Sequence, residues 1–385
     1  MKHFIGINIK FVLAVVIFFC CGVINAYAST EKDTFFSHYR SYQSQAEAGA
    51  EEEVLGKQAS ALATQSKSVF GNTHINTINL TISAANHYRN AQINDKALVL
   101  YDTALGLYKE SDEDRELDFA NLLMEILSGI ELDLSSRDRT RLSNDLYDVL
   151  NNYFDEDSYT DDTLHYSLMM FNSLVEDGAI TRKMRSLSGF SKTLVNIANE
   201  KLAQKSNVLI RANYNVGRLA ESRKRKNDAI EYYTKVVDII EQEVDYDHPY
   251  ALGSHARLVS LFESKGESEE ATKHCVAIGK MTPWEDDLEP MPLYRKNPKY
   301  PINYAKRGKE GYAIIQFDIT PYGFVANPRV LEVDGSQFAK AGIEALTGWR
   351  YAPKFVDGQA TTAKDRQIRL EFTLGSRNKS SLNNS

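Results

Sequence analysis

The hydrophobic pattern divides the chain into a long helical part and a shorter mixed part. None of the nine prolines occurs before Pro249. Proline interrupts helices, because it lacks a backbone donor and clashes with the preceding turn. The proline-free stretch is rich in Ala, Leu, Glu and Lys, which favour helices. Residues 29–281 are therefore predicted to be helical, whereas alternating strand patterns begin after Asn297.

Repeated helix pairs are clearest between Asn215 and Ile278. In the first unit, Val216-Gly217 is followed by Ala229, Tyr233 and Val236. The second unit has a comparable set: Leu258, Phe262, Gly266, Ala271 and Cys275. Small residues let two antiparallel helices approach closely, and a Gly suits the left-handed turn between them. The pattern resembles the tetratricopeptide repeat.

The spacing of the two units refines this resemblance. Ala229 and Ala271 are 42 residues apart, and Asp247-His248-Pro249 opens the second unit with a predicted capping acid. Both features resemble the kinesin-light-chain type of repeat. A weaker third unit is predicted from Ala85, Tyr88, Ala97, Tyr101 and Ala104. Between the units, helical patterning alone is visible, at Leu122, Leu123, Ile126, Leu127 and Ile130.

The C-terminal part is predicted to be a small α+β domain over residues 297–374. A short helix from Ile302 to Arg307 precedes a strand in which Ala313, Ile315, Phe317 and Ile319 share one face. Pro321-Tyr322-Gly323 forms a turn into a second strand that ends at Glu332. A helix from Phe338 to Trp349 and a last alternating strand, Arg366 to Leu374, complete the domain. The predicted architecture is a short sheet with helices on one face.

Several of these residues recur in the order and spacing of a known family. They are Tyr300, Pro301, Gly311, Phe317, Gly323, Trp349, Arg350, Tyr351, Pro353 and Phe372. The set resembles the C-terminal domain of the TonB family and covers about a fifth of the chain. Phe317, Trp349 and Phe372 are expected to be core residues. The whole chain is thus interpreted as an all-α tetratricopeptide-like solenoid followed by a TonB-type domain.

The resemblance implies a binding mode and partners. TonB-type domains bind the plug peptide of an outer-membrane TonB-dependent transporter at an exposed sheet edge, and the family transduces energy for uptake from an inner-membrane ExbB/ExbD-like complex. The candidate edge is Arg366 to Thr373, with Gln367, Arg369 and Glu371 pointing outward. The segment before Tyr300, comprising Arg295, Lys296 and Asn297, is a second candidate contact.

Two departures from the family argue against energy transduction and leave transporter binding intact. No ionisable residue lies between Phe11 and Ala28, where the family carries a membrane His. The family's long Pro-Lys and Pro-Glu spacer is also missing, and repeats replace it. The alternative function is a non-energised periplasmic scaffold or adaptor, in which the repeats bind an unknown protein and the TonB-like domain docks.

The N-terminus predicts export to the periplasm of a Gram-negative cell. Lys2 and Lys10 precede an apolar run from Phe11 to Ile24, and Ala26-Tyr27-Ala28 fits a cleavage site. Residues 1–28 are thus interpreted as a signal peptide. The alternative is an uncleaved inner-membrane anchor facing the periplasm. Residues 282–296 are predicted to be a proline-containing linker, and 375–385 a disordered polar tail.

Charge and motifs favour a binding protein over an enzyme. The chain carries a net charge of −7, whereas residues from Met291 onward carry 15 Lys and Arg against 8 Asp and Glu, a local +7. The eight His are scattered, and the usual hydrolase and phosphate-binding motifs are absent from the sequence. His248 and His255 are attributed to a helix start and to packing. The basic run from Arg223 to Lys226 is attributed to a solvated turn, so no nucleic acid, metal or cofactor is expected.

Overall fold

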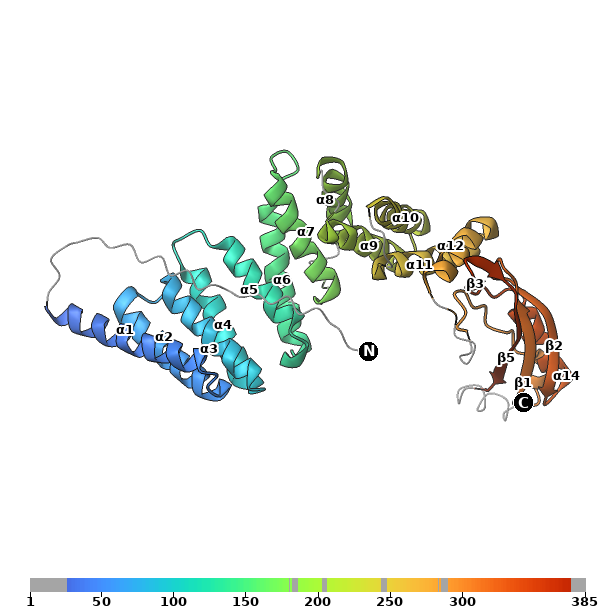
Figure 1. The fold of residues 1–385 in the computed structure, drawn as a ribbon, viewed down its shortest axis with the longest axis horizontal. Coiled ribbons are helices and arrows are strands. Elements are labelled where there is room, and N and C mark those ends of the chain that lie inside the picture. The colour runs from blue at the N-terminus through green and yellow to red at the C-terminus, as the bar shows by residue number, and fades with distance from the viewer. Residues whose placement is uncertain are drawn as a thin grey trace. The chain divides into compact units, whose positions relative to one another are not determined.

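A computed structural model describes residues 26–374, apart from 180, 182–185, 203–205, 244–247, 283 and 285–289. Most of the predicted signal peptide and the whole predicted tail therefore lie outside the described residues. Among the helices that are described, none is long and apolar enough to cross a membrane. The chain divides into two compact units between Asp133 and Leu134, and each is described by itself (Figure 1).

The first unit consists of successive α-helices, each contacting the next, and a short 3-10 helix that contacts the fourth of them. They are α1 (Ala26–Glu47), α2 (Glu52–Phe70), α3 (Ile75–Asn90), α4 (Asn94–Glu110), α5 (Glu116–Ser128) and the short 3-10 helix η1 (Ile130–Leu132). The alanines of the weaker predicted repeat, Ala85, Ala97 and Ala104, are fully buried between α3 and α4. One detail of the sequence pattern was wrong. Ile130 is 91% exposed, because α5 ends at Ser128 and the helical stripe does not continue through it.

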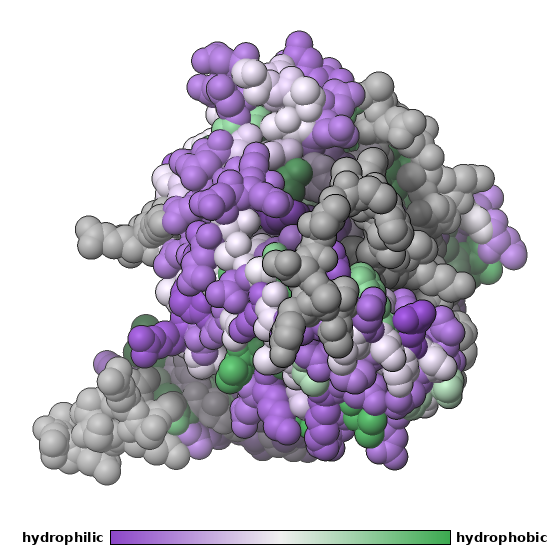
Figure 2. All heavy atoms as spheres, turned by 90° about the vertical axis from the view of Figure 1, so that its left-hand side faces the viewer, coloured by the Kyte–Doolittle hydropathy of each residue, from purple (hydrophilic) through white to green (hydrophobic). Residues whose placement is uncertain are grey.

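Hydrophilic residues dominate the visible face of the molecule in Figure 2, and hydrophobic residues form small separate spots on it. In the first unit the exposed large hydrophobic side chains include Val54 and Val99. Isolated apolar side chains are normal on a soluble surface and do not define an interaction site.

The second unit begins with stacked helix pairs. Its helices are α6 (Ser136–Tyr153), α7 (Asp161–Glu176), α8 (Leu187–Lys201), α9 (Asn207–Ser222), α10 (Lys226–Glu243), α11 (Pro249–Lys265) and α12 (Ser268–Met281). Each helix from α6 onward contacts its successor, and α7 also contacts α9, as α9 contacts α11. Contacts between alternate helices are typical of a solenoid, in which each pair stacks on the previous one. The tetratricopeptide-like solenoid is thereby confirmed.

Small residues bring the repeat helices together as the sequence predicts. Ala229 and Ala271 are fully buried. A Cβ atom added to Gly217 on α9 would lie 2.8 Å from the Tyr233 ring on α10, so this contact requires glycine. Gly266 has a φ of 81° and forms the left-handed end of α11.

The start of α11 differs in one detail from the prediction. His248 is the N-cap residue, and its Nδ1 accepts a hydrogen bond from the Tyr250 amide at 3.2 Å. Asp247, the predicted capping acid, lies outside the described residues. Pro249 occupies the first turn as expected, where its missing N–H has no cost.

The C-terminal domain is an antiparallel sheet covered by helix α14. Its elements are α13 (Ile302–Ala305), β1 (Gly311–Ile319), β2 (Val325–Val333), α14 (Ser336–Leu346), β3 (Lys354–Val356), β4 (Gln359–Thr361) and β5 (Ala363–Phe372). The strand order is β2-β1-β5, and α14 contacts β1 and β2. Ala313, Ile315, Phe317 and Ile319 point into the core together, where Trp349 is also buried. The predicted α+β architecture is therefore present.

A second, two-stranded sheet was not predicted. β3 and β4 form a hairpin whose turn residues, Asp357 and Gly358, both have positive φ, 50° and 74°. Such a turn matches the right-handed twist of the two strands, and Asp-Gly is one of its preferred sequences. The hairpin connects α14 to β5, and β3 contacts α12 of the last repeat.

Candidate peptide-binding site

β5 lies at an edge of the three-stranded sheet and pairs with β1 on its other side. Its register with β1 runs without interruption from Arg366, opposite Phe317, to Phe372, opposite Gly311. Leu370 and Phe372 are buried, and Ile368 is half-buried. The residues between them, Gln367, Arg369 and Glu371, are exposed, as the alternating pattern predicts. An edge strand of this kind has backbone groups available for another strand.

The opposite edge, β2, is much less suited to accepting a strand. Its pairing with β1 shifts register twice, between Ile314 and Ile315 and between Gln316 and Asp318. Pro328 lies in the middle of β2 and lacks an amide donor, and Asn327 before it has a φ of 50°. Bulges and prolines of this kind are common protections of sheet edges. Of the two edges, β5 alone combines exposure with a long regular backbone.

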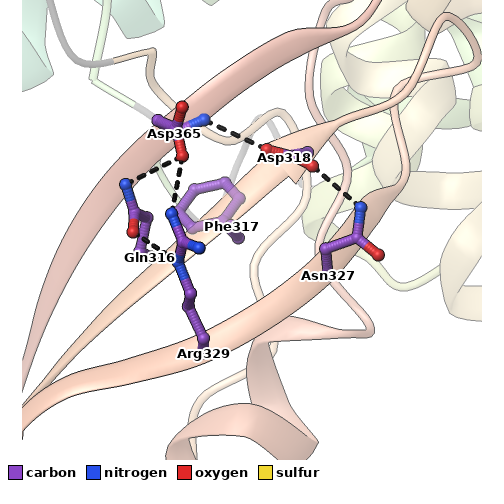
Figure 3. A pocket seen from close by; sticks show the side chains of 6 residues that line it. All are labelled: Gln316, Phe317, Asp318, Asn327, Arg329 and Asp365. Atoms are coloured by element: carbon purple, nitrogen blue, oxygen red, sulfur yellow. Dashed lines mark hydrogen bonds and ion pairs between the residues drawn. The ribbon is translucent and has the colours of Figure 1, made fainter.

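A network of polar side chains connects all three strands on the exposed face of the sheet (Figure 3). Asp318 on β1 accepts from the Asn327 amide at 2.8 Å and from the Asp365 backbone amide at 3.0 Å. The Asp365 carboxylate in turn accepts from Gln316 at 3.0 Å and from Arg329 at 2.8 Å. These residues line a shallow pocket of about 260 Å³.

The network stabilises the sheet where its pairing is irregular. Asn327 and Asp365 have left-handed backbones, with φ of 50° and 61°. Asp318 lies between them and holds both bulged strands, and its bond from Asn327 keeps the pKa of its carboxyl below the usual value. Each polar side chain of the network bonds to another member of it, so we assign it a positioning role. It fixes the start of β5 just before the regular edge begins.

The charged side chains of β5 also interact with β1. The Arg369 guanidinium lies 3.5 Å from the centre of the Tyr312 ring, and its Nε donates to Glu371 at 3.2 Å. Both members of this ion pair are about half exposed or more. The edge thus presents a balanced pair of charges and an aromatic ring.

The segment Arg295 to Asn297 is exposed, but it lies beside Trp349 rather than beside β5. The Arg295 guanidinium lies 4.9 Å from the Trp349 ring centre, and Trp349 Nε1 donates to the Lys296 carbonyl at 2.8 Å. The connection to β5 comes through Tyr300, whose hydroxyl donates to Lys309 O at 2.8 Å and whose ring meets Phe372 edge-on. The two predicted contact groups therefore occupy separate places on the domain.

The remaining motif residues have structural positions. Phe317, Trp349, Tyr351 and Phe372 are at most 3% exposed, as expected for core residues. Pro301 caps α13, and Gly323 forms the β1–β2 turn with a φ of 77°. Arg350 is different, because it is 1% exposed and its guanidinium contacts Glu263 of α11 at 2.5 Å. Sequence reasoning placed Arg350 in the motif and did not foresee this partner.

The repeats contain a second concave site. Side chains from α7, α9 and α11 line a pocket of about 350 Å³: Val175, Arg218, Leu219, Glu221, Ser222 and Arg257. Val175 and Leu219 are its buried apolar lining residues. Arg257 is paired with Glu221 at 3.3 Å, whereas Arg218 makes a long bond of 3.4 Å to Asn215. The pocket lining therefore combines two arginines with two apolar side chains.

The histidines and the basic run behave as the sequence interpretation proposed. His255 is 3% exposed, and its Nδ1 lies 2.8 Å from Nδ1 of His274. Burial lowers the pKa of His255 to about 4, and burial together with the neighbouring His255 lowers that of His274 to about 4. The run Arg223 to Lys226 is exposed and joins α9 to α10. Within the described residues, no group of three or more His, Cys, Asp or Glu is placed to hold a metal ion.

Comparison with known proteins agrees with the C-terminal fold. Residues 296–374 match the family described as "Gram-negative bacterial TonB protein C-terminal", so this part of the chain is a TonB-type domain. Proteins of that family are periplasmic or face the periplasm. No curated protein matches the chain.

Solved structures that resemble the chain are helical repeat proteins. BtubC (BKLC) from P. vanneervenii has a TM-score of 0.40 and 13% identity, covering 63% of this chain and 87% of its own. A protein of Podosopora anserina, described as a kinesin light chain with nearly identical TPR-like repeats, has a TM-score of 0.28 and 11% identity, covering 65% of this chain and 93% of its own. Similarity at this level supports no argument about function. The assignment of repeats rests on the helix pairs described above.

Proposed function

We propose that the protein binds an outer-membrane TonB-dependent transporter in the periplasm, by adding an extended transporter segment to the sheet beside β5. The observation that carries this proposal is the regular, exposed edge from Arg366 to Phe372. Backbone pairing supplies affinity that tolerates sequence variation, and side chains beside the edge supply selectivity. Gln367, Arg369 and Glu371 are placed to provide that selectivity.

Two adjacent proline substitutions test the proposal. Successive N–H groups of a strand point to opposite edges, so one of Arg366 and Gln367 donates towards β1 and the other outward. Arg366→Pro and Gln367→Pro are therefore matched controls for each other. The variant that loses the inward donor should lose stability. The variant that loses the outward donor should stay folded and bind plug-segment peptides at least about tenfold more weakly. A tenfold loss of affinity corresponds to about 1.4 kcal/mol, which is near the contribution of one hydrogen bond between uncharged groups.

The measurement is binding of labelled plug-segment peptides to the full-length protein, followed by fluorescence anisotropy. Arg369→Ala should weaken binding only modestly, because the backbone carries most of the affinity. If both proline variants remain folded and bind as well as the wild type, strand addition at β5 is wrong. The same conclusion follows if no peptide from the organism's transporters binds the wild type.

The role in energy transduction depends on the N-terminus. We infer cleavage after Ala28, which releases the protein into the periplasm without an anchor and makes transporter docking its function. Mass spectrometry of the native protein should show Ser29 as the first residue. An intact N-terminus in the membrane fraction would instead favour the anchored form, coupled to an inner-membrane ExbB/ExbD-like complex.

A scaffold is the second candidate function, and the pocket between α7, α9 and α11 favours it. Its guanidinium groups and apolar lining residues suit a protein segment that carries an acidic residue next to an apolar one. The repeats would then hold a second protein while the C-terminal domain docks. Arg218→Glu should abolish capture of such a partner and leave peptide binding at β5 unchanged.

A further inference from the structure

We propose that the C-terminal domain is the cap of the helical array, docked on α11 and α12 in the place that a further repeat would occupy. An array of stacked helix pairs ends in an apolar face that must be covered. Three independent features of the second unit identify the C-terminal domain as that cover: an ion pair, a pair of glycines and a shared apolar cluster. This inference does not depend on transporter binding.

The ion pair repeats one that joins two successive repeats. Glu221 at the end of α9 binds Arg257 of α11, with 3.3 Å between Oε1 and Nη1. Glu263 at the end of α11 is 42 residues after Glu221, the same interval that separates Ala229 from Ala271. Glu263 binds Arg350 of the C-terminal domain, with 2.5 Å between the same kinds of atoms. Arg350 therefore takes the place of the arginine that a following repeat would supply.

Arg350 is fixed to both sides of the interface. Its Nη2 donates to Thr272 Oγ1 of α12 at 2.7 Å and to the Tyr322 carbonyl of its own domain at 2.9 Å. The guanidinium carbon also lies 3.7 Å from the centre of the Phe324 ring. A side chain held from two elements in this way determines their relative position more strictly than apolar contact does.

Two glycines permit close approach, one from each side. A Cβ on Gly279 of α12 would lie 2.6 Å from the Pro353 carbonyl. Across the interface, a Cβ on Gly323 would lie 3.2 Å from Cys275 Cβ on α12, and within its own domain it would lie 2.1 Å from the Tyr351 carbonyl. Gly279 lies inside a helix, where glycine is unfavourable. Its helical environment gives no reason for glycine, whereas the contact with Pro353 does.

The apolar surfaces are continuous across the interface. Val259, Ala271, Cys275 and Ile278 of the last helix pair form a buried cluster. Leu293, Tyr294 and Ala352, which follow the helices or belong to the C-terminal domain, pack against this cluster. Ser260 Oγ of α11 also donates to the Leu293 carbonyl at 3.1 Å. β5 supplies none of the contacts described here, so docking and strand addition use different parts of the domain.

Gly279→Ala in the full-length protein tests the docking. It should shift the thermal midpoint of unfolding in opposite directions, depending on whether α12 is covered by the C-terminal domain or uncovered. If α12 is uncovered, alanine raises the thermal midpoint, because it is the better helix former. If the domain is docked, the added Cβ meets Pro353 and lowers the midpoint. Gly189→Ala is the matched control: Gly189 lies in α8 of the same unit, and nothing lies within 4 Å of its added Cβ. This control should raise the midpoint.

Alkylation of Cys275, resolved by mass spectrometry, gives a second measurement. The thiol is fully buried beside Gly323, and burial raises its pKa to about 11, so the wild type should react slowly. Glu263→Gln should speed its alkylation by about tenfold or more, because a charged hydrogen bond at the interface is lost. Glu221→Gln, the same change one repeat earlier, should leave the rate unchanged.

The proposal is overturned if Gly279→Ala raises the midpoint as Gly189→Ala does. It is also overturned if Cys275 of the wild type reacts at the rate of an unprotected thiol, or if Glu263→Gln leaves that rate unchanged. Peptide binding at β5 is measured on the same variants and should stay at the wild-type level. Failure of docking and failure of transporter binding are therefore separate results.

Discussion

The two glutamate–arginine pairs of the second unit have the same position in the repeat pattern and different environments. In the pair between α9 and α11, Arg257 is 51% exposed and Glu221 32% exposed. In the pair between α11 and the C-terminal domain, the Arg350 side chain is 2% exposed and the Glu263 side chain 11% exposed. An exposed pair contributes little to stability, because water solvates its charges well in either state. The buried pair is different, since losing one partner leaves a charge without solvent.

The largest expected effect is at the buried pair. Arg350→Met should lower the free energy of unfolding by about 3–5 kcal/mol, because Glu263 is left buried and unpaired. Both tryptophans, Trp284 and Trp349, belong to the linker and the C-terminal domain. Urea unfolding followed by tryptophan fluorescence therefore reports on this region.

A double variant sharpens this result. Arg350→Met combined with Glu263→Leu removes both charges and should recover most of the lost stability. Arg350 Nε has no hydrogen-bond partner among the described residues, so the ion pair is not fully satisfied to begin with. A double variant as unstable as the single one would show that the loss comes from packing rather than from charge.

Acidification should also destabilise the last repeat. The pKa values of His255 and His274 are lowered to about 4 in the folded state, whereas a histidine in the unfolded chain has a pKa of about 6.5. Below pH 6.5 the unfolded chain therefore binds more protons than the folded protein. Stability is then present above pH 6.5 and is lost as the pH falls towards 4. Between pH 7 and pH 5 we expect a loss of about 2 kcal/mol per histidine. Glu241 lies 3.9 Å from His255, and the charges of Glu270 and Lys273 act on His274, the first raising and the second lowering its pKa.

The variant His274→Gln isolates this effect. Urea midpoints measured at pH 7 and pH 5 should differ less in the variant than in the wild type, since one buried titrating group is gone. An equal pH dependence in the two proteins would mean that neither histidine is protected from protonation in solution.

A tight helix contact should give a smaller effect. Ala229→Leu adds volume to a fully buried position in the contact between α9 and α10, and the strain should cost about 1–3 kcal/mol. Loss of helical circular dichroism on heating is the measurement. Ile230→Leu, a neighbouring change of similar volume at a half-buried position, is the control and should leave the midpoint nearly unchanged.

The smallest effect is expected at the exposed pair. Glu221→Gln should change the free energy of unfolding by no more than about 1 kcal/mol, because its partner Arg257 remains solvated. A loss as large as that of Arg350→Met would contradict the comparison from which these predictions start. The measurement is the free energy of unfolding of both variants from chemical denaturation. The salt concentration is kept the same, because salt screens exposed charges.

The sequence predicts those parts of the fold that are carried by local patterns. The alternation in β1 and β5 identifies their buried faces, and small residues such as Ala229 and Gly217 identify the repeat helices. The β3–β4 hairpin was missed although Asp357-Gly358 is a strong local turn signal, because its strands are only three residues long. Helix α14 was predicted to reach Trp349, but it ends at Leu346. The prediction was too long because Trp349 is buried after the helix and continues its hydrophobic pattern.

The candidate site was less predictable, because it depends on which strands become neighbours. Alternation suggests that β5 has one buried face, but it does not show that β1 is the central strand and that β2 and β5 are the two edges. Pro328 was the available signal, since proline is tolerated at edges and rarely in central strands. The partner of Arg350 could not be predicted, because Glu263 is 87 residues away and nothing between them indicates their contact.

The irregular β2 strand has a consequence for assembly. A sheet with two open edges can grow without limit, since the free edge of one copy accepts the free edge of the next and a filament results. Here Pro328 and the left-handed Asn327 protect the β2 edge, so the β5 edge of one copy does not find a matching β2 edge on the next. Copies of this domain are therefore hindered from extending one sheet head to tail.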